Sequence, residues 1–169
     1  AQAMARLGSA VTQVEMADRV LSREDTEVSQ FAAETLRADG VTLLLGHQAL
    51  RCEWAADGDK QLVVSHQGTE QHIAFDELIC AVGRAARLSG YGLEDLGIPT
   101  QRTISTNEAL QTLLPNIYAA GDVVGPYQFT HAAAHQAWYA AVNALFGQFK
   151  RFRVDYRVIP AVTFIDPEV

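Results

Sequence analysis

The sequence predicts an α/β fold, and three stretches of the chain predict it. Residues 1–45 alternate helix-like and strand-like segments. Residues 49–75 contain alternating apolar segments separated by turn residues, and residues 116–147 join a short apolar strand to an alanine-rich helix. Helices that alternate with short apolar strands indicate a parallel sheet, whereas closely spaced strands with turns between them indicate antiparallel pairing.

The composition argues against several classes of protein. The 169 residues can bury a core in one domain or in two small ones. The net charge is −7 and no basic stripe is present, so we expect no nucleic-acid partner. No apolar run reaches the length of a membrane helix and no signal peptide is visible, so we expect no membrane partner. Cys52 and Cys80 do not make a disulfide framework, and we expect separate, buried, reduced thiols in a cytoplasmic protein.

The first part of the chain is expected to form a helix, a strand, a second helix and a second strand. The opening segment indicates a helix ended by Gly8, and the short strand that follows ends at Glu15. An amphipathic helix is expected over residues 22–38, and a buried strand over residues 41–45. The two strands should be parallel because a helix connects them. The apolar face of the second helix is expected to consist of Val28, Phe31, Ala32, Thr35 and Leu36.

The middle of the chain is expected to be antiparallel. Asp57-Gly58 and Gln67-Gly68 separate segments of alternating polarity within residues 49–75, which predicts a β meander. The apolar run at 77–82 follows, and we expect it to be a strand that closes the sheet and ends at Gly83.

The most informative segment is residues 116–122. An uncharged strand is expected to deliver Asp122 to its carboxyl end, where ligands of open α/β sheets collect. Gly121 lets the backbone approach a bound molecule closely. A helix is then expected to begin with Thr130 as its N-cap and to end by Gly147. The positive helix terminus beside a carboxylate suits a sugar-like chain joined to an electron-poor ring.

The helix after Thr130 is dense in alanine, which permits close approach of a neighbouring backbone and predicts an interior helix. His131 and His135 share one face of it, a spacing that also occurs in metal sites. No third ligand is evident nearby, so we expect packed or hydrogen-bonded histidines and no metal.

Three motifs together resemble those of a known family. The motifs are AVGR at 81–84, IYAAGD at 117–122, and IPAVTF with DPE within 159–168. In their order and spacing they resemble the pyridine nucleotide-disulfide oxidoreductases, the flavoprotein family of dihydrolipoamide dehydrogenase and mercuric reductase.

The resemblance implies partial Rossmann-like FAD- and NAD(P)-binding domains with an inserted antiparallel β meander. Residues 1–84 would be the NAD(P)-binding domain without its first strand and glycine-rich loop. Residues 85–149 would be the C-terminal part of the FAD-binding domain, and residues 150–169 a linker with the first strand of a dimerisation domain. A strand is accordingly expected over 156–165, and its uncovered edge favours a homodimer.

The resemblance also implies which residues bind FAD. Asp122 and Gly121 would contact the ribityl or diphosphate region. The start of the alanine-rich helix would offer backbone donors to the flavin ring and ribityl chain, from Gln128, Phe129, Thr130 and His131.

NAD would be bound by residues earlier in the chain. Glu15 would hydrogen-bond the adenosine ribose, and a carboxylate at that place repels the extra phosphate of NADP. NAD is therefore expected rather than NADP. Gly83 would lie beside the nicotinamide side of the dinucleotide, and the backbone near Ala49 would border the adenine.

By this resemblance the parent protein is a flavin-dependent oxidoreductase in which electrons pass from NAD(P)H through FAD to a disulfide or similar acceptor. The family's redox-active cysteine pair and its C-terminal His-Glu pair have no counterpart in the sequence. We therefore assign no catalytic residue and expect the chain alone to be inactive. Two other interpretations remain open: a nucleotide-binding module without a redox role, and a flavin-dependent relative such as an NADH dehydrogenase or a ferredoxin reductase.

Overall fold

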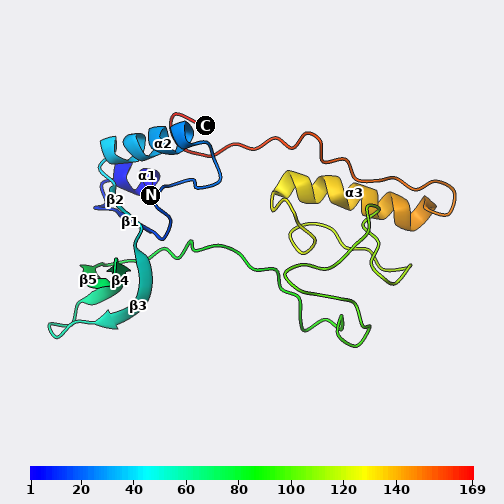
Figure 1. Cartoon of the computed structure of the whole chain (residues 1–169), viewed down its shortest axis with the longest axis horizontal. Helices are drawn as coiled ribbons and strands as arrows, with labels where there is room; N and C mark the ends of the chain where they lie inside the picture. The colour runs from blue at the N-terminus through cyan, green and yellow to red at the C-terminus, as the bar shows by residue number, and fades with distance from the viewer. The chain divides into compact units, whose positions relative to one another are not determined.

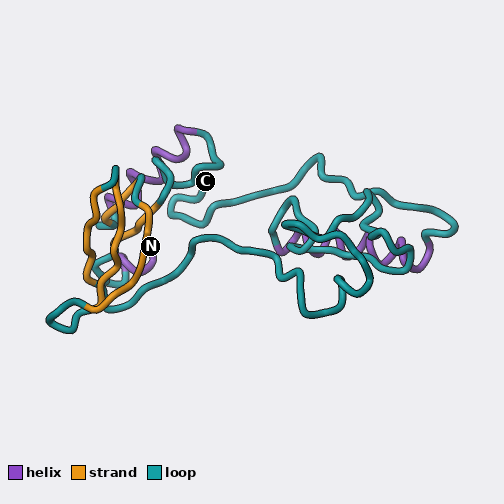
Figure 2. Tube along the Cα trace, turned by 60° about the horizontal axis from the view of Figure 1, so that its bottom comes forward, coloured by secondary structure: helices purple, strands orange, loops and turns teal.

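The structure, a computed structural model, describes residues 1–169. The chain forms two compact units: the first consists of Ala1–Cys80 with Ala161–Val169, and the second of Ala81–Pro160. The first unit contains the helices α1 (Gln2–Arg6) and α2 (Thr26–Ala38) and all five strands, and the second contains the helix α3 (Thr130–Phe146) (Figure 1). Loops, drawn in teal in Figure 2, make up most of the second unit, where the only regular element is α3.

The α/β part of the first unit is a two-stranded parallel sheet with two helices. Its elements in order are α1 (Gln2–Arg6), β1 (Thr12–Glu15), α2 (Thr26–Ala38) and β2 (Thr42–Leu45). β1 pairs with β2 in parallel, as predicted from the helix that connects them. α2 begins at Thr26 rather than at residue 22, because the preceding residues form a turn in which the Glu24 N–H donates to the Leu21 carbonyl.

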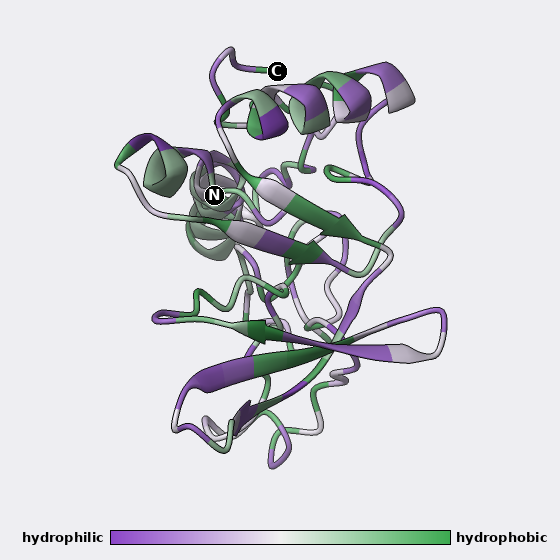
Figure 3. Cartoon of the chain, turned by 90° about the vertical axis from the view of Figure 1, so that its left-hand side faces the viewer, coloured by the Kyte–Doolittle hydropathy of each residue, from purple (hydrophilic) through white to green (hydrophobic).

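One face of α2 is buried in the core of the first unit. Ala32 is fully buried and Leu36 is 6% exposed, and both pack in a cluster with Val20 and Val41. The buried positions of α2 are Ser29, Ala32, Ala33 and Leu36, which follow the helical period. Phe31 was predicted to be on this face but is 42% exposed, because the buried stripe is centred on Ala32 and Ala33. Figure 3 shows the green, hydrophobic part of β2 beneath the alternating green and purple turns of α2.

The predicted β meander is confirmed. Its strands are β3 (Gln48–Trp54), β4 (Lys60–His66) and β5 (Thr69–Ala74), which pair in antiparallel fashion in the order β3-β4-β5. Val63 and Val64 in the central strand are both fully buried. A bulge interrupts the pairing of β3 with β4 between Ala49 and Arg51.

Residues 161–169 fold back onto the first unit and do not form the predicted strand. The Ile165 side chain packs against the core beside α2. The Gln2 side-chain amide donates to the Asp166 carbonyl at 2.9 Å and accepts from the Asp166 N–H at 2.9 Å. Arg6 pairs with the Asp166 carboxylate at 2.5 Å. The strand prediction for 156–165 is wrong, because no neighbouring strand forms a ladder with this segment and side chains of α1 bind its end instead.

The second unit consists of loops packed against one face of α3 (Thr130–Phe146), whose C-cap is Gly147 as predicted. A small core of Leu93, Ile98 and Ile104 lies among these loops. The predicted strands at 77–82 and 117–122 are not formed. The first has no pairing partner, and Ile79 and Val82 are 73% and 87% exposed. The second makes only one isolated bridge, between Tyr118 and Gln111.

Two further findings concern the cysteines and the length of the helices. Cys52 and Cys80 are free, but both are exposed rather than buried, because the first lies on a meander strand and the second in the unpaired segment after β5. None of the three helices combines the length and the apolar character needed to cross a membrane.

Candidate functional site

The turn at residues 121–125 lies directly against the first turns of α3. Gly121 and Gly125 both have positive φ angles, +85° and +67°, and both are buried. The Val124 N–H donates to the Gly121 carbonyl at 2.9 Å, which closes the turn. A Cβ atom at Gly121 would lie 3.4 Å from the Ala133 Cβ. Glycine is therefore required here both for the backbone conformation and for the close approach to the helix.

A buried glutamine on α3 holds both ends of this turn. Gln136 is 0% exposed. Its Oε1 accepts a hydrogen bond from the Gly121 N–H at 2.6 Å, and its Nε2 donates to the Gly125 carbonyl at 2.9 Å. The same Nε2 donates to the Tyr156 hydroxyl at 2.8 Å. The sequence analysis missed this residue, although a buried amide in an alanine-rich helix requires partners and thereby signals a loop packed against it.

Asp122 follows Gly121, and its side chain is 38% exposed. Its ion-pair partner is Arg84, whose Nε lies 3.9 Å from Asp122 Oδ2 and whose side chain is 81% exposed. An ion pair of this length and exposure leaves the carboxylate accessible to a ligand. The acid is thus neither remote from α3 nor buried in an ion pair.

The amino end of α3 has no side-chain cap. Phe129 is the N-cap, with extended backbone angles, and Thr130 is the first helical residue. The prediction of Thr130 as N-cap is therefore wrong by one position. The N–H groups of a helix's first turn have no acceptor within the helix and remain available to a ligand. The rings of Phe129 and His131 stack with their centroids 5.3 Å apart, and Gln128 is exposed just before them.

Gly83 lies in the exposed segment that leads to Arg84. Its φ is +122°, and no atom lies within 4 Å of where a Cβ would be. The ion pair between Arg84 and Asp122 nevertheless brings two of the family motifs, at 81–84 and 117–122, to one place in the second unit.

Within this chain α3 is buried on one side only. Its buried residues are Ala132, Gln136 and Asn143, whereas Trp138 is 54% exposed. The loops of the second unit cover a single face, which is the face that carries the two amides. The His135 Nε2–H donates to the Asp155 carbonyl at 3.0 Å. No three His, Cys, Asp or Glu side chains gather as a metal site would require.

The predicted NAD residues Glu15 and Ala49 lie in the first unit. Glu15 is the last residue of β1, and its Oε1 accepts from the Ala17 N–H at 2.9 Å. The Glu15 carbonyl accepts a hydrogen bond at 3.0 Å from the N–H of His47, which lies just beyond the end of β2. Ala49 is exposed on β3, beside the bulge and opposite Val64.

A pair of stacked histidines, not predicted from the sequence, joins these elements. The His47 and His66 rings lie 4.3 Å apart and are nearly parallel. Their Nδ1 atoms hydrogen-bond the carbonyls of Leu45 at 2.6 Å and Gly46 at 3.0 Å. The stack fixes the backbone at the carboxyl end of β2 against the meander.

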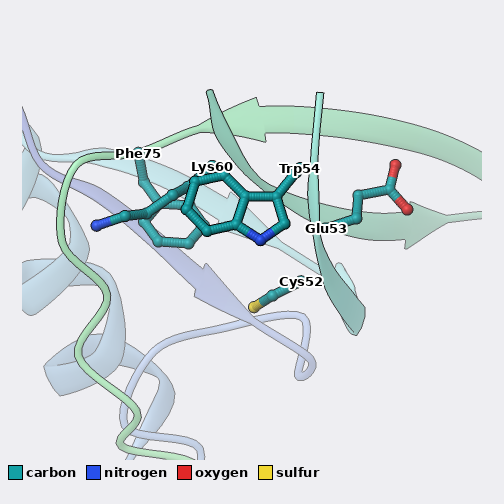
Figure 4. A pocket seen from close by; sticks show the side chains of 5 residues that line it. All are labelled: Cys52, Glu53, Trp54, Lys60 and Phe75. Carbon is teal, nitrogen blue, oxygen red and sulfur yellow. The ribbon is translucent and has the colours of Figure 1, made fainter. Parts of the chain in front are cut away.

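Two pockets lie on the meander, and neither is lined by a predicted cofactor residue. The smaller has a volume of about 170 Å³, and Figure 4 shows the Trp54 and Phe75 rings side by side on its wall, with the Cys52 sulfur nearby. The larger, of about 360 Å³, is open and lined mainly by polar groups that include Asp76 and Glu77.

Comparison with known proteins gives consistent results. A family model described as pyridine nucleotide-disulphide oxidoreductase matches residues 1–137. The chain is 34% identical over 165 residues to a mercuric reductase from Staphylococcus aureus, covering 96% of this chain and 30% of the relative. It is 32% identical over 166 residues to a dihydrolipoyl dehydrogenase from Bacillus subtilis, covering 98% of this chain and 35% of the relative.

A solved structure is similar over nearly the whole chain. It is the Cu(II) complex of the HOCl-induced flavoprotein disulfide reductase RclA from Escherichia coli, with a TM-score of 0.83 and 30% identity, covering 99% of this chain and 38% of that one. This chain thus spans about a third of the length of the relatives it matches. The likeness confirms the predicted partial Rossmann-like α/β fold, and the chain belongs to the pyridine nucleotide-disulphide oxidoreductase family.

Proposed function

We propose that the protein carrying this chain is an FAD-dependent oxidoreductase that passes electrons from NAD(P)H through flavin to a disulfide or similar acceptor. The family supports this reaction, and one observation within the chain carries it. That observation is the accessible Asp122 carboxylate, on a turn held against the uncapped first turns of α3.

These residues fit the polar part of FAD. A carboxylate accepts hydrogen bonds from ribityl hydroxyls, and Gly121 lets the turn lie close against α3, which keeps Asp122 near the start of the helix. The uncapped N–H groups at residues 130 and 131 favour electron-rich or anionic groups, such as the pyrimidine side of the flavin ring. FAD supplies the redox chemistry, and the residues of this chain bind and orient it.

NAD is the proposed dinucleotide, in preference to NADP. Glu15 lies at the carboxyl end of β1, and its charge would accept from a ribose hydroxyl and repel a phosphate at the same place. Its present bond to the Ala17 N–H leaves the other carboxylate oxygen free for this contact. The backbone of Ala49, in the same unit as Glu15, is proposed as a further contact to the dinucleotide.

The partners and location are proposed as well. We place the protein in the cytoplasm as a homodimer, with domain boundaries at residues 84 and 149. The chain alone is proposed to be inactive, because none of its residues is assigned as a nucleophile or a general acid.

FAD binding by the protein that carries this chain tests the proposal. Flavin absorbance of the purified protein should show bound FAD, and NADH should drive reduction of a small disulfide. Asp122→Asn should lose the flavin, whereas Asp95→Asn should retain it, because Asp95 is an exposed acid of the same unit outside the proposed site. A protein that takes up no FAD, or an Asp122→Asn variant with unchanged affinity, would overturn the proposal. Flavin binding without oxidation of NADH would instead indicate a nucleotide-binding module.

A further inference from the structure

The buried face of α3 carries two amide side chains about two turns apart. Gln136 is 0% exposed and Asn143 is 3% exposed. A buried amide is costly unless its donors and acceptor are satisfied. Both residues meet that requirement entirely with loop backbone and one hydroxyl, so each amide ties a loop to the helix.

The two amides tie different loops. Asn143 donates to the carbonyls of Ala109 at 3.1 Å and Phe152 at 2.8 Å, and accepts from the Phe152 N–H at 2.8 Å. Gln136 instead bonds Gly121 and Gly125, the two ends of the turn that contains Asp122. Only the bonds of Gln136 therefore bear on where the Asp122 carboxylate lies.

We propose that Gln136 is a positioning residue for FAD, because its amide fixes the 121–125 turn and thereby holds Asp122 at the mouth of α3. This inference rests on the proposed function. The amide is suited to the task since the turn presents an N–H at one end and a carbonyl at the other. One side chain that both accepts and donates satisfies the two ends at once.

The same amide extends the support to the last part of the second unit. Gln136 Nε2 donates to the Tyr156 hydroxyl, and the Tyr156 ring lies 5.5 Å from the ring of Tyr127, which follows Gly125 by two residues. Burial raises the pKa of Tyr156, which extends the pH range over which its hydroxyl stays protonated. The turn is thus braced by α3 through Gln136 and by the Tyr127–Tyr156 contact.

A matched pair of variants tests the role of Gln136. Gln136→Glu and Asn143→Asp each replace a buried amide of α3 by a carboxyl group of nearly the same shape. In the full-length protein, stability to urea and the Kd for FAD are measured for both variants and for the wild type. Both variants should be less stable. Gln136→Glu should also bind FAD at least about tenfold more weakly, which corresponds to about 1.4 kcal/mol, whereas Asn143→Asp should keep the Kd within about twofold of the wild type.

The pH dependence of Gln136→Glu supplies a readout that a general loss of stability does not move. A buried glutamate has a raised pKa, and when protonated it can again donate to the Gly125 carbonyl while it accepts from the Gly121 N–H. The FAD affinity of Gln136→Glu relative to the wild type should therefore recover as the pH falls. Gln136→Leu, which has neither donor nor acceptor, should show no recovery.

The outcomes separate this inference from the proposed function. A wild-type protein that binds no FAD overturns both. FAD binding that Asp122→Asn abolishes but Gln136→Glu leaves at the wild-type Kd overturns the inference alone. Equal losses of affinity in Gln136→Glu and Asn143→Asp, without recovery at lower pH, would likewise show that Gln136 contributes only to the general stability of the unit.

Discussion

Arg84 Nε lies 3.9 Å from Asp122 Oδ2, and this ion pair links the segment after the meander to the turn beside α3. Arg84 is 81% exposed at its side chain and Asp122 is 38% exposed. Exposed pairs of this kind contribute on the order of 0–1 kcal/mol, because water screens both charges. The pair therefore does not determine the fold of the turn, which the bonds of Gln136 define.

Replacement of Arg84 by glutamine should leave the stability of the second unit nearly unchanged. We expect the free energy of unfolding to shift by less than about 0.5 kcal/mol, because the pair is long and exposed. Urea unfolding followed by Trp138 fluorescence in a Trp54→Phe background reports the second unit alone, since the chain has two tryptophans, one in each unit. A loss of more than about 1 kcal/mol would show that the pair supports the turn after all.

Replacement of Gly121 by alanine should cost more. Its φ of +85° is unfavourable for a residue with a Cβ by about 1–2 kcal/mol. The new methyl group would also lie in contact with the Ala133 Cβ, and the Gly121 N–H must keep its bond to Gln136. We therefore expect both lower stability in the same fluorescence assay and weaker FAD binding in the full-length protein.

Gly97→Ala is the control for Gly121→Ala. Gly97 belongs to the same unit and has a φ of +63°, but no atom lies within 4 Å of where its Cβ would be. It should show the conformational cost without the change in FAD affinity. Equal FAD affinities of the two variants would show that the packing of the turn against α3 at Gly121 does not affect FAD binding.

The elements that sequence patterns predicted correctly are those whose partners lie close by in the chain. The meander strands β3, β4 and β5 pair with their immediate neighbours, and β1 and β2 pair across the single helix α2. Each can form from residues that the pattern already contains. The end of α3 was likewise predictable from Gly147, because glycine commonly marks the end of a helix.

The strand predictions that failed concern segments that need a partner strand, and the local sequence pattern does not show whether a partner is present. The apolar runs at 77–82 and 156–165 have the composition of strands, but a strand forms only where another strand supplies hydrogen bonds. No strand of this chain pairs with either run. The same reasoning explains Cys80, which was expected to be buried in a strand and is exposed in an unpaired segment.

The candidate site was predicted in part. Motif spacing identified Gly121, Asp122 and the start of α3, and the structure brings the turn and the helix together. Motif spacing did not identify Gln136, because alanines dominate the composition of α3. The useful signal was the pair of amides on one face of the helix, since polar side chains on a buried face imply loops that need to be held.

Acid should disrupt one local contact of the second unit at a defined pH. Hydrogen bonds from Arg157 lower the pKa of Asp155 from 3.8 to about 2. The larger effect comes from the Arg157 side chain and the smaller from its backbone N–H. A carboxyl group whose pKa is lower in the folded state stabilises that state above its unfolded pKa and loses the effect as the pH falls through the folded pKa. The Asp155 contribution should therefore be complete above about pH 4 and should vanish toward pH 2.

NMR titration of the Asp155 carboxyl group measures this effect directly. In Arg157→Gln the pKa should return toward its ordinary value, and the His135 bond to the Asp155 carbonyl should persist because it uses the backbone. An unchanged titration in Arg157→Gln would show that the Arg157 bonds do not lower this pKa.

The core beside α2 should govern the order of both α2 and the C-terminal segment. Leu36 is 6% exposed in this core, and Leu36→Ala should lower the stability of the first unit by about 2–5 kcal/mol through lost burial and the cavity left behind. α2 is short, and a helix of its length depends on packing for its stability. Ile165 packs against the same core, so the chain end at residues 161–169 should loosen together with the helix.

Hydrogen exchange of the α2 amides and of the Ile165 N–H follows both effects in one experiment. Leu36→Ala should reduce protection at both places. Leu7→Ala should change neither, because Leu7 is 80% exposed and surface truncations of this kind shift stability by no more than about 0.5 kcal/mol. Loss of protection in α2 with the Ile165 N–H unaffected would mean that the bonds of Gln2 and Arg6 to Asp166, rather than the shared core, hold the C-terminal segment.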